Sequence, residues 1–298
     1  MIKRILDISE QAYIHLHQQQ LQIEKQGKLV ASIPVEDLGV LILQHPAIVV
    51  TQTALVACQQ NNTVVVFCNA QHLPYSVLLP LTEGHSLHTR ILRQQMEITQ
   101  PTRKRLWQQI VRAKIAQQAT VLEQTGESSP HLHRMLNKVK PGDPENHEAQ
   151  AAQHYWRKLM GDDFRRDRTA GGINALLNYG YAIMRAVLAR SLVGTGLHPA
   201  LGLHHRNQYN GLCLADDLME PFRPWVDYEV HQYAANADPP EVCRDSKQRL
   251  LALLSAPVSL ADKQLPLMVA SHQLAAGLKS AIAGDSRDLL FPQKIWDN

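Results

Sequence analysis

The chain has 298 residues, of which 45% are hydrophobic and 19% are charged, with a formal net charge of +3. This length and composition exclude a wholly disordered chain and allow one large domain or two modest ones with a buried core. No stretch reaches the roughly 18–20 apolar residues that a bilayer crossing requires, since residues 47–57 are interrupted by Thr51, Gln52 and Thr53. The N-terminus lacks the features of a secretory signal, so we expect a cytoplasmic protein.

The first eighty residues contain short apolar runs rich in Val and Ile, at 5–8, 13–16, 21–23, 29–33, 40–43, 48–50 and 64–67. Residues 13–17 and 21–24 alternate with the period of two that half-buried strands show. A helix is expected at 51–60, where Thr51 can cap the apolar run that follows. The pattern predicts a strand-rich domain over residues 1–84, a small β-sandwich or barrel.

After Pro80, apolar residues recur at helical spacing, which predicts an all-α domain over residues 85–298. A loop at 140–144 opens a helix that contains Glu148 and Tyr155. A buried helix is expected at 175–190 and a glycine-rich loop at 194–211, with further helices from about Leu218 and Leu265. The expected fold class is therefore α+β, a small β-sandwich domain followed by a larger helical domain.

The cysteines are Cys58, Cys68, Cys213 and Cys243, and no two of them form a CxxC pair. The sequence therefore offers neither a zinc framework nor a thioredoxin-like motif, and we expect free, buried thiols. Motifs for nucleotide triphosphates, serine nucleophiles, HExxH zinc sites and EF-hands are also missing from the sequence. Energy-coupled phosphoryl transfer is not expected.

Two polar segments lie at the edges of apolar elements. Glu148 opens an alanine-rich helix whose small side chains let another element approach, although the helix dipole alone also favours a glutamate there. The second segment, Gly202-Leu203-His204-His205, follows a turn. A neutral imidazole is a common metal ligand or proton carrier, whereas most lone histidines are neither. The residues by themselves leave both interpretations open.

A third segment, residues 216–224, places Asp217 and Glu220 three residues apart. Because Pro221 is tolerated in a first helical turn but not in a helix interior, the helix is expected to begin close to Asp217. The two acids would then form a capping box, which needs no metal. The same spacing also puts both carboxylates on one helix face, where they could share a divalent cation. Spacing does not decide between these interpretations.

Basic residues are concentrated in two stretches of the second domain. Residues 90–114 hold seven basic residues against Glu97 alone, and a second group follows Glu148. Such runs are often only solvated helix faces, but a shared groove would suit a phosphate backbone. The candidate DNA-binding residues are Arg90, Arg93, Arg103, Arg105, Lys158, Arg165, Arg166 and Arg168.

Four segments, residues 142–155, 174–181, 196–205 and 217–224, have an order and spacing that resemble the CRISPR-associated integrase and endonuclease family, the first-numbered Cas protein, in its compact type II-like form. The resemblance implies that Glu148, His205 and Glu220 are catalytic ligands of Mg²⁺ or Mn²⁺. It places Asp217 in an auxiliary acidic position and prefers His205 to His204. The implied reaction is a metal-assisted transesterification that joins the 3′-hydroxyl ends of captured DNA to the CRISPR repeat, with no nucleotide cofactor.

The resemblance also implies partners. It predicts a homodimer through the β domain, and two such dimers bridged by a dimer of the second-numbered Cas protein on double-stranded DNA. Three alternatives remain open: a nuclease that cuts branched DNA without integrating it, a non-catalytic DNA-binding assembly subunit in which Glu148 and Glu220 only end helices, and a small-molecule metallohydrolase.

Overall fold

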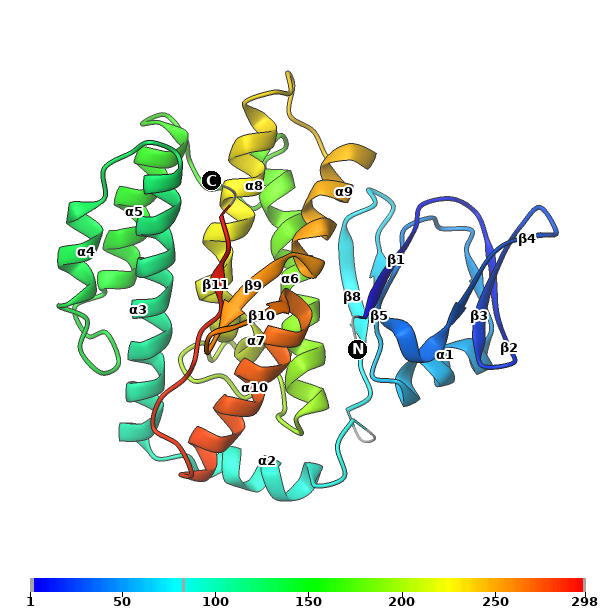
Figure 1. Cartoon of the computed structure of the whole chain (residues 1–298), viewed down its shortest axis with the longest axis horizontal. Coiled ribbons are helices and arrows are strands. Elements are labelled where there is room, and N and C mark those ends of the chain that lie inside the picture. Colours follow the sequence, from blue (N-terminus) through cyan, green and yellow to red (C-terminus); the bar gives the residue numbers. More distant parts are fainter. Residues whose placement is uncertain (1–2, 82–83, 297–298) are drawn as a thin grey trace.

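The structure, a computed structural model, describes residues 3–81 and 84–296. A strand-rich N-terminal part lies at one end of the molecule and a mainly helical part at the other (Figure 1). The first part contains β1 (Arg4–Ile8), β2 (Tyr13–His17), β3 (Gln20–Lys25), β4 (Lys28–Pro34), η1 (Val35–Asp37), β5 (Leu38–Leu43), β6 (Val49–Val50), α1 (Gln52–Gln60), β7 (Val64–Cys68) and β8 (Pro74–Leu78).

These strands form two four-stranded sheets, in the orders β1-β5-β7-β8 and β4-β3-β2-β6. β5 is buried along its whole length and pairs in parallel with β1 and β7, as expected of an unbroken apolar run covered on both faces. The alternating β2 and β3 pair antiparallel, with Ile14 opposite Ile23. Both sheets share an apolar core with α1, which includes Leu21, Leu41 and Val65. Every strand predicted in this part is present, and β8 was not predicted.

The predicted helix at 51–60 is confirmed as α1, and Thr51 caps it. The Thr51 side-chain oxygen accepts a hydrogen bond from the Ala54 amide at 3.4 Å. This bond satisfies one of the amides that a helix leaves unpaired at its start.

The second part contains α2 (His88–Met96), α3 (Gln100–Gln124), α4 (Pro130–Leu136), α5 (His147–Met160), α6 (Ile173–Gly194), α7 (Cys213–Met219), η2 (Glu220–Phe222), α8 (Arg223–Ala234), α9 (Arg244–Ala252), η3 (Leu253–Ser255), β9 (Pro257–Leu260), β10 (Lys263–Pro266), α10 (Leu267–Ala283) and β11 (Gln293–Lys294). The α+β fold class is confirmed. The small sheet β10-β9-β11 is an addition to the predicted all-helical part, because it depends on Gln293 pairing with Ser259, which no local pattern signals.

Helix α6 lies at the centre of the molecule, between the other helices and the first sheet (Figure 1). It is buried along most of its length, and its apolar residues share one core with Val40, Ile42, Val64 and Val66 of the sheet. The strand-rich and helical parts are thus joined by a continuous core. The division at residue 84 into two domains stays a prediction.

The prediction that a helix begins near Asp217 with a capping box is wrong. Helix α7 begins at Cys213, and Asp217 lies inside it without capping anything. The chain accommodates Pro221 by ending α7 at Met219 and forming the one-turn helix η2, in which the proline occupies the first turn. The missing proline amide is tolerated there because first-turn amides have no intrahelical partner.

All four cysteines are free, but they are not all buried as predicted. Cys58 and Cys213 are buried, Cys68 is half-buried and Cys243 is exposed. Burial raises the pKa of Cys58 to about 11, which keeps that thiol protonated near neutrality. Among the described residues, the helices are either too short or too polar to cross a membrane.

Gly180 lets α6 and α8 approach closely. A Cβ added at this position would lie 2.4 Å from Cγ1 of Val226, and Val226 is buried. The absence of a side chain at position 180 therefore allows the short distance between α6 and α8, the helix that follows η2.

We predict that Gly180→Ala destabilises the protein although alanine is the better helix former. Overpacking costs about 1–3 kcal/mol against a propensity gain of about 1 kcal/mol, so the free energy of unfolding should fall by up to about 2 kcal/mol. Denaturant unfolding measures this, and the double variant Gly180→Ala, Val226→Ala should lose less than the sum of the two single variants. If the losses in unfolding free energy are additive, or if Gly180→Ala alone stabilises the protein, the contact with Val226 does not limit how closely α6 and α8 pack.

Candidate metal centre

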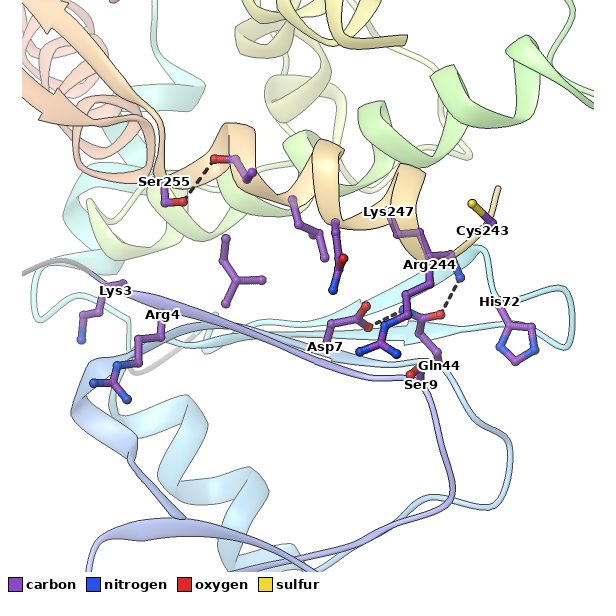
Figure 2. Close-up of a pocket in the computed structure, with 14 residues that line it drawn as sticks. Lys3, Arg4, Asp7, Ser9, Gln44, His72, Cys243, Arg244, Lys247 and Ser255 are labelled. Atoms are coloured by element: carbon purple, nitrogen blue, oxygen red, sulfur yellow. Dashed lines mark hydrogen bonds between the residues drawn. The ribbon is translucent and has the colours of Figure 1, made fainter. Parts of the chain in front are cut away.

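Two hollows bear on where the chemistry lies. The first is a cleft of about 750 Å³ between β1 and α9 (Figure 2). Gln44 links its two walls, since its amide donates to Asp7 and its oxygen accepts from Lys247 at 2.5 Å. Cys243 lies at the cleft, and hydrogen bonds from the Ser246 amide and the Tyr233 hydroxyl lower its pKa to about 7. None of the predicted catalytic residues lines this cleft.

The second hollow, a cavity of about 220 Å³, is lined by all three predicted catalytic residues, Glu148, His205 and Glu220. They come from α5, the loop before α7, and η2, so three separate segments of the chain meet there. The other lining residues include Lys114, Gln118, Arg166, Arg168, Tyr181, Arg223 and Asp227.

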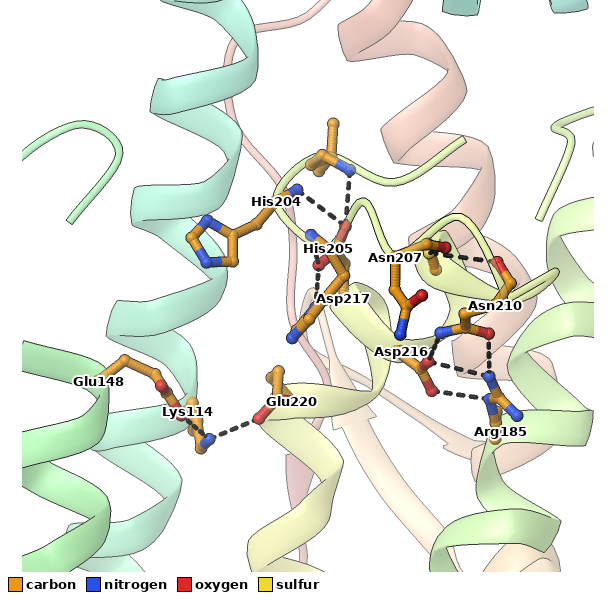
Figure 3. A network of polar contacts seen from close by, with 12 residues as sticks. Lys114, Glu148, Arg185, His204, His205, Asn207, Asn210, Asp216, Asp217 and Glu220 are labelled. Atoms are coloured by element: carbon orange, nitrogen blue, oxygen red, sulfur yellow. Dashed lines mark hydrogen bonds and ion pairs between the residues drawn. The ribbon is translucent and has the colours of Figure 1, made fainter. Parts of the chain in front are cut away.

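Glu148 is placed by the loop before α5. Asp143 is buried, and its two carboxylate oxygens accept hydrogen bonds from the amides of His147 and Glu148 at 3.0 and 2.9 Å. The loop thereby caps the first turn of α5 from outside the helix, in place of the N-cap residue Asn146. The Glu148 side chain leaves that first turn towards α3 (Figure 3).

Asp217 organises the loop that carries His205. Its fully buried carboxylate accepts hydrogen bonds from the amides of Leu203, His204 and His205, at 2.6, 3.0 and 3.2 Å. It also contacts Nδ1 of the His205 ring at 2.6 Å. These contacts orient the imidazole and raise the pKa of His205, and they leave Nε2 as the second ring nitrogen available to a ligand.

Gly202 allows this loop to close on Asp217. A Cβ at Gly202 would lie 2.3 Å from the carbonyl oxygen of His205 and 2.9 Å from Oδ2 of Asp217. A larger residue would push the loop off the carboxylate. The glycine in the Gly-Leu-His-His segment is therefore required by packing.

The two adjacent histidines have different surroundings. The ring of His204 stacks on Trp107 of α3, with centroids 4.2 Å apart and planes 5° from parallel. Partial burial and the neighbouring His205 lower the pKa of His204. Of the two, only His205 lines the cavity with the acids.

Lys114 lies between the two glutamates (Figure 3). Its side chain is 8% exposed, and its ammonium donates to Oε1 of Glu148 and, at 2.5 Å, to Oε2 of Glu220. The other oxygen of Glu220 accepts from Nε of Arg223 at 2.9 Å. Burial would favour the neutral forms, but the opposite charges prevail, so the pKa of Lys114 is raised and that of Glu220 is lowered.

The position of Lys114 bears on whether the predicted ligands are arranged to hold a metal ion. In the described ranges 3–81 and 84–296, no three His, Cys, Asp or Glu side chains lie close enough together to hold a metal ion. The ammonium of Lys114 lies between the two carboxylates, and His205 contacts Asp217. The predicted ligands thus share a cavity without forming a finished coordination shell.

In the sequence, Lys114 is one of the basic residues of 90–114, predicted to form either a solvated helix face or a phosphate-binding groove, and its place in the site was not predicted. The signal was its helical phase, because Lys114 falls on the same buried face of α3 as Ile110, Val111 and Ile115. A lysine on an apolar stripe is rarely buried without a charged partner. Arg223, which contacts Glu220, lies within the segment 217–224, but no role was predicted for it.

The predicted DNA-binding residues do not form one group. Arg166 and Arg168 line the cavity of the glutamates, and Arg103 lines a neighbouring hollow with His205. Arg90 and Arg93 are exposed on α2, Lys158 pairs with Glu127, Arg165 bonds to nearby carbonyls and Arg105 lines a hollow beside the end of α10. The structure therefore brings two of the eight to the site itself.

A family model described as "CRISPR associated protein Cas1" matches residues 7–238. The chain belongs to this family. It is 34% identical over 297 residues to the CRISPR-associated endonuclease Cas1 of Neisseria meningitidis serogroup C (strain 8013), covering 98% of this chain and 97% of that relative. The resemblance to the Cas1 family inferred from the four sequence segments is confirmed.

Two solved structures share the Cas1-family fold at low identity. A casposase bound to an integration product superposes with a TM-score of 0.79 and 18% identity, over 97% of this chain and 92% of that one. A chain of a Cas6-RT-Cas1–Cas2 complex gives a TM-score of 0.74 and 18% identity, over 99% of this chain and 36% of that one.

We predict that Asp217→Asn loosens the His205 loop. The asparagine side chain would place an NH₂ group among backbone N–H donors. It would also leave buried backbone N–H groups without an acceptor, which costs about 2–4 kcal/mol of unfolding free energy. Denaturant unfolding in EDTA measures the loss, and hydrogen exchange should locate faster exchange at residues 203–205. Asp163→Asn, a change of an exposed aspartate, is the control and should alter neither. Unchanged exchange at 203–205 would contradict this role of Asp217.

Proposed function

We propose that this chain is a metal-dependent DNA integrase of CRISPR adaptation, which joins the 3′-hydroxyl ends of captured DNA to the CRISPR repeat. The proposal depends mainly on the convergence of Glu148, His205 and Glu220 on one cavity in a chain of the Cas1 family. The Neisseria relative is by name an endonuclease, and the casposase with the same fold was captured on an integration product. Both names support DNA phosphodiester chemistry for this chain.

The residues of the cavity suit a divalent metal. Two carboxylates and one imidazole nitrogen are a donor set compatible with Mg²⁺ or Mn²⁺, and the carboxylates already share a cation, the ammonium of Lys114. Glu148, Glu220 and His205 would hold the metal. When bound, it would supply Lewis-acid polarisation of a phosphate and lower the pKa of an attacking hydroxyl.

The other residues of the site hold these ligands and approach the DNA. Asp217 fixes the tautomer and direction of His205 through its contact with Nδ1, and this orienting contact fits its predicted auxiliary position. Lys114 and Arg223 together keep Glu220 ionised, and Arg223 holds its Oε1 oxygen. Arg166 is fixed over Tyr181 by Asn174 and Asn178.

Arg168 is exposed at the cavity, where it can contact a phosphate, which positions a duplex without reading its bases. The remaining candidates, Arg90, Arg93, Arg103, Arg105, Lys158 and Arg165, would extend this contact along the duplex.

We also propose the partners. Residues 1–84 would act as a dimerisation domain and residues 85–298 as the catalytic, DNA-binding domain. Leu29 and Val30 of the outer strand β4 are more than half exposed, which supports an interface on the strand-rich part. The Cas1–Cas2 assembly named for one relative in fold supports a second Cas protein as partner. The expected complex has two dimers of this chain and one dimer of that protein.

The competing function is a nuclease that cuts branched DNA with the same residues and joins nothing. The endonuclease name of the Neisseria relative favours this alternative as much as it favours an integrase. The two differ in whether a 3′ hydroxyl of DNA or water attacks the phosphate, so an assay that offers both separates them.

We predict metal-dependent strand transfer of a labelled short duplex into a supercoiled plasmid carrying a CRISPR repeat, with Mn²⁺ and the second Cas protein. His205→Ala, Glu148→Gln and Glu220→Gln should each reduce joining by about 10²-fold or more, because each removes a ligand of the metal. His204→Ala is the matched control and should retain most activity, since that ring stacks on Trp107. Cleavage without joining would favour the nuclease, and full activity in all three variants would refute the site.

Charge reversal at Arg168 should weaken DNA binding without unfolding the chain. Losing one phosphate contact lowers the slope of log K against log salt by about 0.9, so Arg168→Glu should bind duplex more weakly with a flatter salt dependence. Arg168 suits this test better than Arg166, which is half-buried and bonded to two asparagines. Arg134→Glu on α4, also exposed, is the control. Equal affinity of both variants and wild type over a salt series would remove Arg168 from the interface.

A further inference from the structure

The buried ammonium of Lys114 contacts both Glu148 and Glu220, the two acids that would hold a divalent cation. We propose that Lys114 is a built-in counter-ion that holds the two acids together in the metal-free protein, and that metal binding displaces its ammonium. The inference rests on the proposed metal site and concerns how that site is kept ready and how tightly it binds.

The distribution of charge around Glu220 supports the proposal. The side chain is 7% exposed, and each carboxylate oxygen has its own cation, Lys114 on Oε2 and Arg223 on Oε1. An unpaired carboxylate would be costly at this burial. The metal-free chain therefore needs the ammonium to fold with Glu220 ionised.

Glu148 is less buried, at 27% exposure, and the one ion pair recorded for it within the described residues is with Lys114. A metal that binds both glutamates must therefore take at least one oxygen from the ammonium. A dication and an ammonium repel each other at contact distance inside a protein, so the two cations compete for the same oxygens.

Gln118 provides a place for the displaced ammonium. It lies one turn further along α3, lines the same cavity and is 2% exposed. Its side-chain oxygen Oε1 is buried without a hydrogen-bond partner among residues 3–81 and 84–296. A buried amide oxygen left unpaired is unusual, and an ammonium on a flexible four-carbon chain can reach a residue one turn away. Rotation of the Lys114 side chain would satisfy that oxygen without moving the backbone.

Two properties follow for the protein. The chain folds before metal arrives, because Lys114 already neutralises the acids. Metal affinity is lower than the three donors alone would give, because binding must also move a paired cation.

The test compares Mn²⁺ binding by wild type and Lys114→Met, a change that keeps an unbranched side chain one atom shorter and removes the charge. The full chain is stripped with EDTA and titrated calorimetrically, and its melting temperature is recorded with and without Mn²⁺. Lys114→Met should bind Mn²⁺ about tenfold more tightly or better, melt lower in EDTA and gain more from Mn²⁺ than wild type does. Lys247→Met is the matched control, since Lys247 is equally buried but pairs with Gln44 and should leave Mn²⁺ affinity unchanged.

The possible outcomes separate failure of the counter-ion inference from failure of the proposed metal site. If wild type binds Mn²⁺ through Glu220 and Lys114→Met binds no more tightly, the counter-ion inference is overturned while the metal site stands. If wild type shows no Mn²⁺ binding that Glu220→Gln removes, the proposed metal site itself fails. If Lys114→Met is unfolded in EDTA, folding on addition of Mn²⁺ supports the exchange of cations, and failure to fold with Mn²⁺ contradicts it.

A second variant examines the exchange without altering the lysine. Gln118→Leu removes the oxygen that would receive the ammonium, so Mn²⁺ binding should weaken by about threefold or more while stability in EDTA stays near that of wild type. Unchanged Mn²⁺ affinity in this variant would show that the ammonium does not move to Gln118.

Discussion

The centre of this molecule depends on keeping buried carboxylates ionised. Glu220 and Asp217 are both buried, and each is compensated differently, Glu220 by Lys114 and Arg223, and Asp217 by backbone amides and His205. An isolated charge at such depth would take up a proton or destabilise the fold. These contacts therefore tie α3, α8, the His205 loop and the α7–η2 junction to one another, and the positions of Asp217 and Glu220 follow from them.

Two acids three residues apart, on either side of the junction between α7 and η2, have different partners. Asp217 in α7 meets the loop at 202–205, whereas Glu220 in η2 meets Lys114 of α3. One acid thus orients a histidine and the other faces the cavity. The capping-box interpretation does not describe this segment, because α7 begins at Cys213 and Asp217 lies inside it.

A candidate site with a lysine ammonium between its acids differs from an open cluster of ligands. The ammonium of Lys114 pairs with both Glu148 and Glu220 and so offsets the repulsion between the two carboxylates. Membership of the Cas1 family is the basis on which we propose DNA strand transfer. On that proposal, Arg168 supplies positive charge at the opening of the same cavity.

The sequence by itself determined most of the secondary structure and the names of the residues to test. Short alternating or β-branched runs predicted β1 to β7, and helical periodicity predicted the helices around Glu148 and Tyr179, because burial of one face imposes those periods locally. The motif resemblance chose Glu148, His205 and Glu220, which lie far apart along the chain. Only the tertiary structure decided what surrounds them. That Lys114 is buried between the two acids, that Asp217 serves the His205 loop, and that Gln293 closes a sheet on Ser259 are contacts between distant segments, and such contacts depend on how the helices pack rather than on any local pattern.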